Sequence, residues 1–177
     1  MANIPPKLQA VLDHYKGTLP VPLVEIAHDL DIAVYMTDDL ANSEAGLIRR
    51  NGENHFEVYL NSNQPSSSRQ FTLAHEIAHR VLHEGRLEAG QEHVDGVAQY
   101  VGVLRNGDTS GMSEEDLTLE RAANELADEI VMPAATFTEV WKKYALTQGV
   151  ERVAREFGVS ESTVTLRAAK LLGLVIP

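Results

Sequence analysis

The stretch FTLAHEIAH, Phe71 to His79, places two histidines and a glutamate among apolar residues. Residues four apart on a helix lie about 6 Å apart on one face, so His75 and His79 can bind one metal ion together. Glu76 points farther round the helix and can reach a water at that ion without binding the ion. The spacing H-E-x-x-H therefore predicts two metal ligands and one general base.

This interpretation needs a third ligand, because the short pattern also arises by chance in roughly 3% of shuffled chains of this composition. His83 is not expected to bind, since it lies eight residues, or about 12 Å, after His75. The third histidine of metzincins would stand at position 85, which is a glycine. A carboxylate from another helix is the remaining option.

The segment Leu117 to Met132, LTLERAANELADEIVM, has helical periodicity, with an apolar stripe and most of its charged residues on the opposite arc. Glu120 falls on the core side instead, where a metal ion would make a buried carboxylate favourable. Asn124, one turn later, can orient a ligand histidine. The alternative is that Glu120 lies at the edge of the stripe and reaches solvent.

The composition is that of a soluble globular chain with one domain, or one domain and a small appendage. Its 177 residues are 44% hydrophobic and include no cysteine, so any metal must be bound by His, Asp or Glu. No signal sequence or membrane-spanning run is recognisable, and we expect a cytoplasmic protein.

The net charge of -11 is concentrated in residues 84–129, which hold twelve acids against three arginines. Such a charge disfavours nonspecific binding of nucleic acid. We interpret the acidic run as a solvated loop, with attraction of a basic partner as the alternative.

The residues before the metal motif predict a small antiparallel sheet with a short helical entry. Helical spacing covers residues 5–16 and 22–30, and strands are expected at 32–36, 46–50 and 55–61. Asn51 and Gly52 mark a turn of more than two residues. In the strand at 55–61, Phe56, Val58 and Leu60 are expected on a buried face and Glu57, Tyr59 and Asn61 on a solvated face.

Ser67 and Gln70 match a capping box that would open the helix of the metal motif. After that helix, residues 84–115 suggest a long irregular connection with one strand around 97–104, and a length that hints at a functional loop. A second long helix is expected from Ser113 to its stop at Pro133. We therefore predict a metal-binding core over residues 1–133 and a helical segment over 134–177.

The segment from Ala154 to Val164 has the spacing of a helix, a tight turn and a second helix. A DNA-binding role is one interpretation of this tail. However, residues 148–177 have a charge balance of only +1, and Glu161 would begin the reading helix. DNA binding is therefore not expected, and we favour packing on the core or docking of substrate.

RQFTLAHEIAH, followed by ERAANELADEIVMP, resembles the ImmA/IrrE family of zinc metallopeptidases, and the resemblance covers nearly the whole chain. It implies an α+β, zincin-like core with a helix-turn-helix-like C-terminal segment. It also implies that His75, His79 and Glu120 bind Zn²⁺, for which Mn²⁺ can substitute, and that Glu76 is the base. Leu126 stands where the family usually has Phe, a departure that concerns packing.

By the same resemblance, the expected function is that of an endopeptidase that cleaves a helix-turn-helix (XRE-type) repressor and so derepresses a mobile element or stress operon. The alternatives are a DNA-binding regulator that uses the tail, and a noncatalytic member that binds partners. His83, Tyr100 and Tyr59 are candidates for stabilising the oxyanion. The strand at 55–60 is a candidate for pairing with substrate at a sheet edge. No membrane partner is expected.

Overall fold

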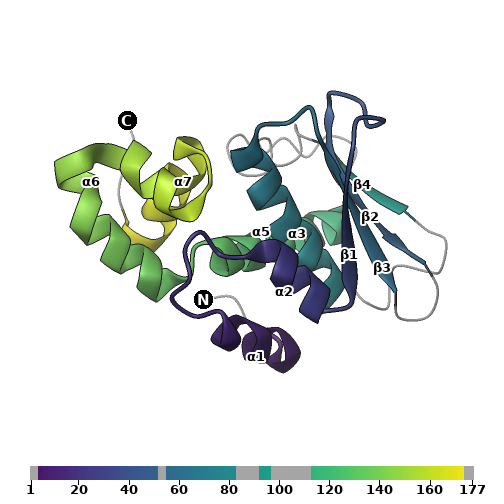
Figure 1. Cartoon of the computed structure of the whole chain (residues 1–177), viewed down its shortest axis with the longest axis horizontal. Coiled ribbons are helices and arrows are strands. Elements are labelled where there is room, and N and C mark those ends of the chain that lie inside the picture. Colours follow the sequence, from purple (N-terminus) through teal and green to yellow (C-terminus); the bar gives the residue numbers. More distant parts are fainter. Residues whose placement is uncertain (1–3, 52–54, 83–91, 97–112, 174–177) are drawn as a thin grey trace.

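The computed structural model describes residues 4–51, 55–82, 92–96 and 113–173 (Figure 1). The chain enters through two short helices, α1 (Pro6–His14) and α2 (Leu23–Asp29), as the sequence predicts. Proline precedes or begins each helix, at positions where its missing N–H has no helical partner to lose. The α+β class is confirmed: Figure 1 shows a sheet at one side of the molecule, with helices packed beside it.

The sheet has the strand order β1-β3-β2-β4. Its strands are β1 (Ile32–Thr37), β2 (Glu44–Arg50), β3 (Phe56–Asn61) and β4 (Glu92–Gly96). β2 pairs antiparallel with β3 and β4, but β1 pairs parallel with β3, so the sheet is mixed and not wholly antiparallel as expected. The reason is that β2 turns back after β1 yet pairs with β3, which then runs in the direction of β1.

The β2–β3 turn is longer than two residues, as predicted. Arg50 pairs with Phe56 across the hairpin, and the Asn51 N–H donates to the His55 carbonyl at 2.8 Å. Five residues therefore connect the last paired positions.

β3 is a central strand, which corrects two expectations. It cannot offer an edge to substrate, because β1 and β2 occupy both of its sides. Its second face is also not solvated: Glu57 and Asn61 are buried. Asn61 donates to the carbonyls of Ala41 and Glu44 at 2.9 and 2.8 Å, so its polar group is satisfied inside the protein.

Helix α3 (Ser66–Leu82) carries the metal motif and packs against β2, β3 and the later helix α5 (Glu114–Val131). It begins at Ser66, two residues before the start at Ser68 that a capping box of Ser67 and Gln70 requires, so that prediction is wrong. The N–H groups of Ser68 and Arg69 donate to the Pro65 carbonyl. The Gln70 side chain instead donates to the Val21 carbonyl at 2.9 Å, which ties α3 to the entry segment.

Helix α5 (Glu114–Val131) begins at Ser113, where Ser113 and Asp116 form a reciprocal capping box. Its predicted apolar stripe faces the core. Asp128 is one of the charged residues on the arc opposite the stripe, yet it is buried, and Lys170 of the tail lies 2.6 Å from its carboxylate. Of the connection before α5, only β4 is described; β4 was not predicted, and the strand expected around 97–104 lies outside the described residues.

The tail forms α6 (Ala134–Phe157), which is kinked at Gly149, and α7 (Glu161–Leu172). Gly158 ends α6 in the left-handed conformation, and Ser160 caps α7, giving the helix–turn–helix spacing. Phe137 and Phe157 belong to the same hydrophobic cluster as the core of α3 and α5, and Trp141 is partly buried against Phe137. The boundary at residue 133 stays a prediction, because the apolar core runs across it.

Candidate metal centre

Three side chains from two helices meet inside the protein. His75 and His79 come from α3 and Glu120 comes from α5, and their exposed fractions are 0%, 5% and 5%. One ligand atom of each lies within 4.8 Å of the others. Glu120 therefore lies on the core side of its helix, as the helical periodicity predicts.

The separations of these atoms suit a shared divalent cation. His75 Nε2 lies 3.3 Å and His79 Nε2 lies 3.1 Å from the Glu120 carboxylate, and the two nitrogens are 2.7 Å apart. Tetrahedral zinc with bonds of 2.0–2.1 Å requires about 3.3 Å between ligand atoms. Two imidazoles and one carboxylate are also donors that zinc and manganese accept. The two distances to the carboxylate match this spacing, and the two imidazole nitrogens are closer together than it requires. The three residues therefore form a donor set that could hold a divalent cation.

Asn124 determines which nitrogen of His75 can bind a metal. Its side-chain oxygen lies 3.0 Å from His75 Nδ1. Because an amide oxygen only accepts, this bond is made by the His75 tautomer that has its proton on Nδ1, and in that tautomer Nε2 has a lone pair for a metal ion. Asn124 lies one helical turn after Glu120, so a single face of α5 supplies both groups.

Glu76 is fully buried and lies against the backbone of β2. A Cβ placed on Gly46 would be 3.5 Å from Glu76 Oε1 and only 2.8 Å from the Thr72 methyl group. The absence of a side chain at Gly46 therefore lets α3 approach the strand closely. The sequence analysis missed Gly46; a glycine within a strand pattern is the signal that could have found it, because such a glycine marks close approach by another element.

The structure does not bring Tyr59 to this centre. Its neighbours Val58 and Leu60 face the core, so by the alternation of a strand Tyr59 points to the other side of the sheet. There its hydroxyl donates to Glu57 at 3.1 Å and accepts from Arg49 at 2.7 Å. Burial and the bond to Glu57 raise the pKa of Tyr59. His83 and Tyr100 lie outside the described residues.

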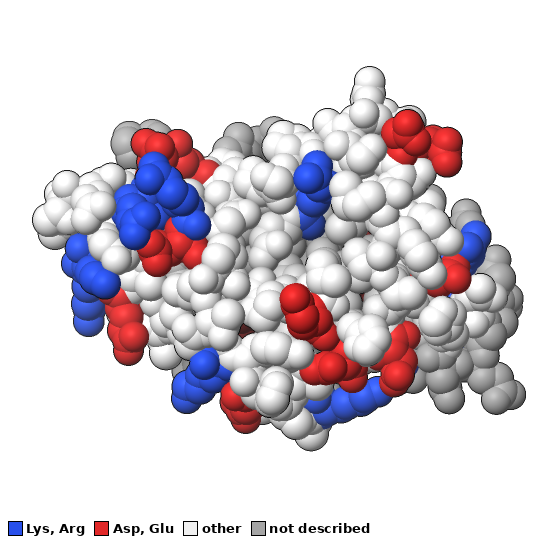
Figure 2. Space-filling view, viewed as in Figure 1, with Lys and Arg blue, Asp and Glu red and all other residues white. Residues whose placement is uncertain are grey.

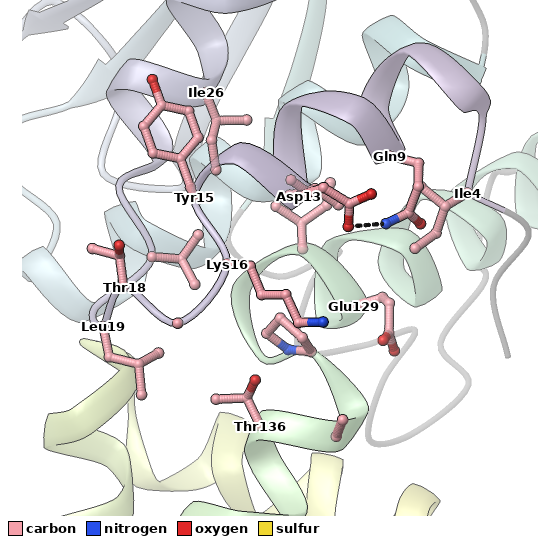
Figure 3. Close-up of a pocket in the computed structure, with 16 residues that line it drawn as sticks. Ile4, Gln9, Asp13, Tyr15, Lys16, Thr18, Leu19, Ile26, Glu129 and Thr136 are labelled. Carbon is pink, nitrogen blue, oxygen red and sulfur yellow. Dashed lines mark hydrogen bonds between the residues drawn. The ribbon is translucent and has the colours of Figure 1, made fainter.

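The cavity in Figure 3 is a separate feature of about 220 Å³. It lies where α1 and the segment after it meet the junction of α5 and α6, and none of the three clustered residues lines it. Gln9 and Asp13 are hydrogen-bonded at its rim, and Lys16 and Glu129 also line it (Figure 3). The cavity therefore plays no part in the metal centre.

No helix formed by the described residues combines the length and the apolar character needed to cross a membrane.

The profile of the family described as IrrE N-terminal-like domain (Peptidase_M78) matches residues 27–169. No curated protein matches the sequence.

Among solved structures, a transcriptional regulator of Mycobacterium tuberculosis is similar, with a TM-score of 0.58 and 16% identity. The match covers 92% of this chain and 46% of that chain, so the present chain spans less than half of its length. At this identity the similarity shows a shared fold.

Proposed function

Since the chain belongs to the IrrE N-terminal-like (Peptidase_M78) family, we propose that it is a zinc-dependent endopeptidase whose site is the His75, His79 and Glu120 cluster with Glu76. The observation that carries this proposal is that three buried donors meet at ligand spacing and that two of them flank Glu76 in the H-E-x-x-H motif. An activity needs all four groups, and the two helices that supply them are far apart in the sequence.

In this proposal His75, His79 and Glu120 hold the metal, and Asn124 orients His75. A zinc ion bound there would act as a Lewis acid that lowers the pKa of a water and polarises a peptide carbonyl. Glu76 takes a proton from the attacking water and passes it to the leaving amine. Manganese would satisfy the same donors.

The proposed substrate is a helix-turn-helix repressor of the XRE type, and its cleavage would derepress a mobile element or a stress operon in the cytoplasm. The family resemblance motivates this substrate class. The similar fold of a protein described as a transcriptional regulator agrees with a role in transcription.

The tail is proposed to pack on the core and not to read DNA. Arg167 of α7 is buried and contacts the Met132 carbonyl and Glu129. Arg152 and Arg155 of α6 are paired with Glu156 and Glu151. Few cations therefore remain on the described part of the tail for phosphate contacts.

The proposal is tested by incubating the purified chain with Zn²⁺ or Mn²⁺ and with repressors encoded beside its gene. The wild type is expected to cut one of them, and Glu76→Gln is expected to lose about 10²–10⁴-fold in rate or more while keeping its metal. Glu125→Gln, at an exposed position of α5, is the matched control and should cut normally. No cleavage with either metal, or equal cleavage by Glu76→Gln, would contradict the proposal.

A further inference from the structure

The outer edge of β1 is open to an additional strand. β1 stands at the end of the sheet order, and no strand among the described residues pairs with its outer side. Phe56 N–H donates to Asp31 and Ser62 N–H donates to Thr37, so the odd-numbered residues of β1 bond to β3. In a parallel ladder the even-numbered residues then direct their N–H and C=O groups away from β3. Ile32, Val34 and Met36 present these groups to the outer edge.

Apolar side chains flank this edge on both faces of the sheet. Tyr35 and Met36 are consecutive, so they point to opposite faces, and they are 44% and 53% exposed. Val24 on the neighbouring helix α2 is 56% exposed. Within the described residues, these are three of the four large hydrophobic side chains that are exposed, and the fourth is Leu146 on α6. Two of the four exposed side chains therefore lie on β1 itself, and a third lies on the helix that packs against β1.

β1 also lacks the devices that usually protect an edge strand. Its sequence, IAVYMT, contains no proline and no charged residue. Natural edge strands are normally blunted by such residues or covered by another element. An edge left in this form can bind an extended polypeptide by adding a strand, with main-chain bonds and alternating side-chain contacts.

The surroundings of the edge are strongly acidic. Residues 17–48 contain six acids and no lysine or arginine. These acids are Glu25, Asp29, Asp31, Asp38, Asp39 and Glu44. Figure 2 shows red side chains over α2 and beyond the far end of β1, with uncharged surface between them. Asp38 and Asp39 follow β1 directly. Asp31, before β1, is paired with Lys7 at 3.6 Å, but Glu25 and Asp29 of α2 keep the local charge at that end negative.

We infer that this β1 edge, formed by residues 32–37, binds an extended segment of a basic partner polypeptide. The segment has alternating apolar residues where it pairs with β1 and Lys or Arg at both ends. A second copy of this chain fits less well, because antiparallel self-pairing would bring the Asp31 end of one β1 beside the Asp38 end of the other. The edge is distinct from the metal cluster, and the inference concerns binding, so it does not depend on peptidase activity.

The test uses a fluorescein-labelled peptide, Lys-Arg-Val-Thr-Val-Thr-Val-Arg-Lys, and the full-length protein in fluorescence anisotropy. The peptide is expected to bind, and a peptide with the same centre and glutamates at both ends is expected to bind at least tenfold more weakly. Binding should weaken as salt is added. Absence of binding, or equal binding of the two peptides, would overturn the inference.

Two variants of Met36 separate the backbone from the side chain. Met36→Pro removes an N–H that faces the outer edge without removing a bond to β3, and it should weaken binding of the basic peptide about tenfold or more. Met36→Thr keeps the N–H and the strand propensity, and it should lose clearly less. Equal loss in the two variants would show that no strand is added.

Charge variants keep the test decisive even if Met36→Pro does not fold. The double variant Glu25→Lys/Asp38→Lys should weaken binding about tenfold at low salt. Glu125→Lys/Glu139→Lys makes the same change in net charge at exposed positions of α5 and α6, and it should bind like the wild type. Equal effects of the two pairs would overturn the assignment to β1. A dimer of the peptide-free protein that Met36→Pro dissociates would show that a second copy occupies the edge.

Discussion

Asn124 links the two helices of the candidate centre through one contact, its oxygen accepting from His75 Nδ1 at 3.0 Å. If this bond orients the imidazole, Asn124→Ala should lower the affinity for zinc by about 10–100-fold. Competition with a chromophoric chelator measures this affinity. Asn124→Asp retains an acceptor and should bind zinc more tightly than Asn124→Ala. Equal affinities of wild type and Asn124→Ala would contradict the orienting role.

Glu57 gives the stability of the fold a dependence on pH. Hydrogen bonds from Arg49, and then from Asn51, hold the pKa of Glu57 below its usual 4.5. The folded state therefore favours the ionised group, and this contribution is complete above pH 4.5 and is lost as the pH falls below 4.5 toward the folded-state pKa.

Glu57→Gln should accordingly lower the free energy of unfolding at pH 7 and make its decline below pH 4.5 less steep than in the wild type. Urea unfolding at a series of pH values measures both effects. Glu139→Gln, at an exposed position, is the control and should stay within about 0.5 kcal/mol of the wild type at pH 7. A decline for Glu57→Gln that is parallel to the wild type would be inconsistent with this role.

Individual residues were predictable where helical periodicity decides which way a side chain points. The positions of Glu120 and Asn124 on the core side of α5 follow from their spacing to the apolar stripe. The prediction from strand alternation was wrong for Glu57 and Asn61. Alternation along a strand does not reveal whether other parts of the chain cover its second face. Arg49, Asn51 and backbone carbonyls supply the hydrogen-bond partners of these two side chains from elsewhere in the chain.

At the scale of elements, the contact between α3 and β2 depends on Gly46. A Cβ at this position would lie 2.8 Å from the Thr72 methyl group, closer than real side chains approach. Gly46→Ala should therefore destabilise the protein by about 1–3 kcal/mol. It should also lower the cleavage rate, because Glu76 follows Thr72 by one turn of the same helix.

A second substitution tests this mechanism directly. Thr72→Ser removes the obstructing methyl group and keeps a hydroxyl to donate to the Ser68 carbonyl, as Thr72 does at 3.0 Å. Gly46→Ala/Thr72→Ser should be more stable and more active than the sum of the single changes predicts. Thermal unfolding and the cleavage rate of all four proteins form the cycle. Strict additivity would mean that the close approach does not matter.

Elements were predicted better than their pairing. The two entry helices, three strands and both long helices follow from local periodicity and from proline positions. The parallel pairing of β1 with β3 depends on the whole path of the chain, and so does the central place of β3. β4 was missed because its five residues, EHVDG, carry no apolar alternation and are recognised as a strand only by pairing with β2.

At the scale of the whole molecule, Arg167 joins the tail to the end of α5. Its guanidinium is buried and donates twice to the Met132 carbonyl, at 3.1 and 2.8 Å, and also contacts Glu129. Arg167→Met would leave that carbonyl and Glu129 without their cation, at a cost of about 3 kcal/mol. Arg155→Met removes an exposed pair with Glu151 and should cost less than about 1 kcal/mol. Denaturant unfolding compares the two, and similar losses would contradict the joining role.

These contacts explain why the tail could be recognised but not placed. The sequence predicts its helix, turn and helix from Gly158 and Ser160. Nothing local indicates that Arg167 is buried against Glu129 or that Lys170 reaches Asp128 of α5. Helix α5 therefore contacts α3 at Glu120 and the tail at its other end.

The central claim, that His75, His79 and Glu120 bind one divalent cation, is tested most directly by the metal content of the purified protein. Inductively coupled plasma mass spectrometry on the wild type should find about one zinc or manganese per chain. Glu120→Ala should contain almost none, and the control Glu125→Ala should match the wild type. A full equivalent of metal in Glu120→Ala, or none in the wild type after dialysis against zinc, would contradict the account.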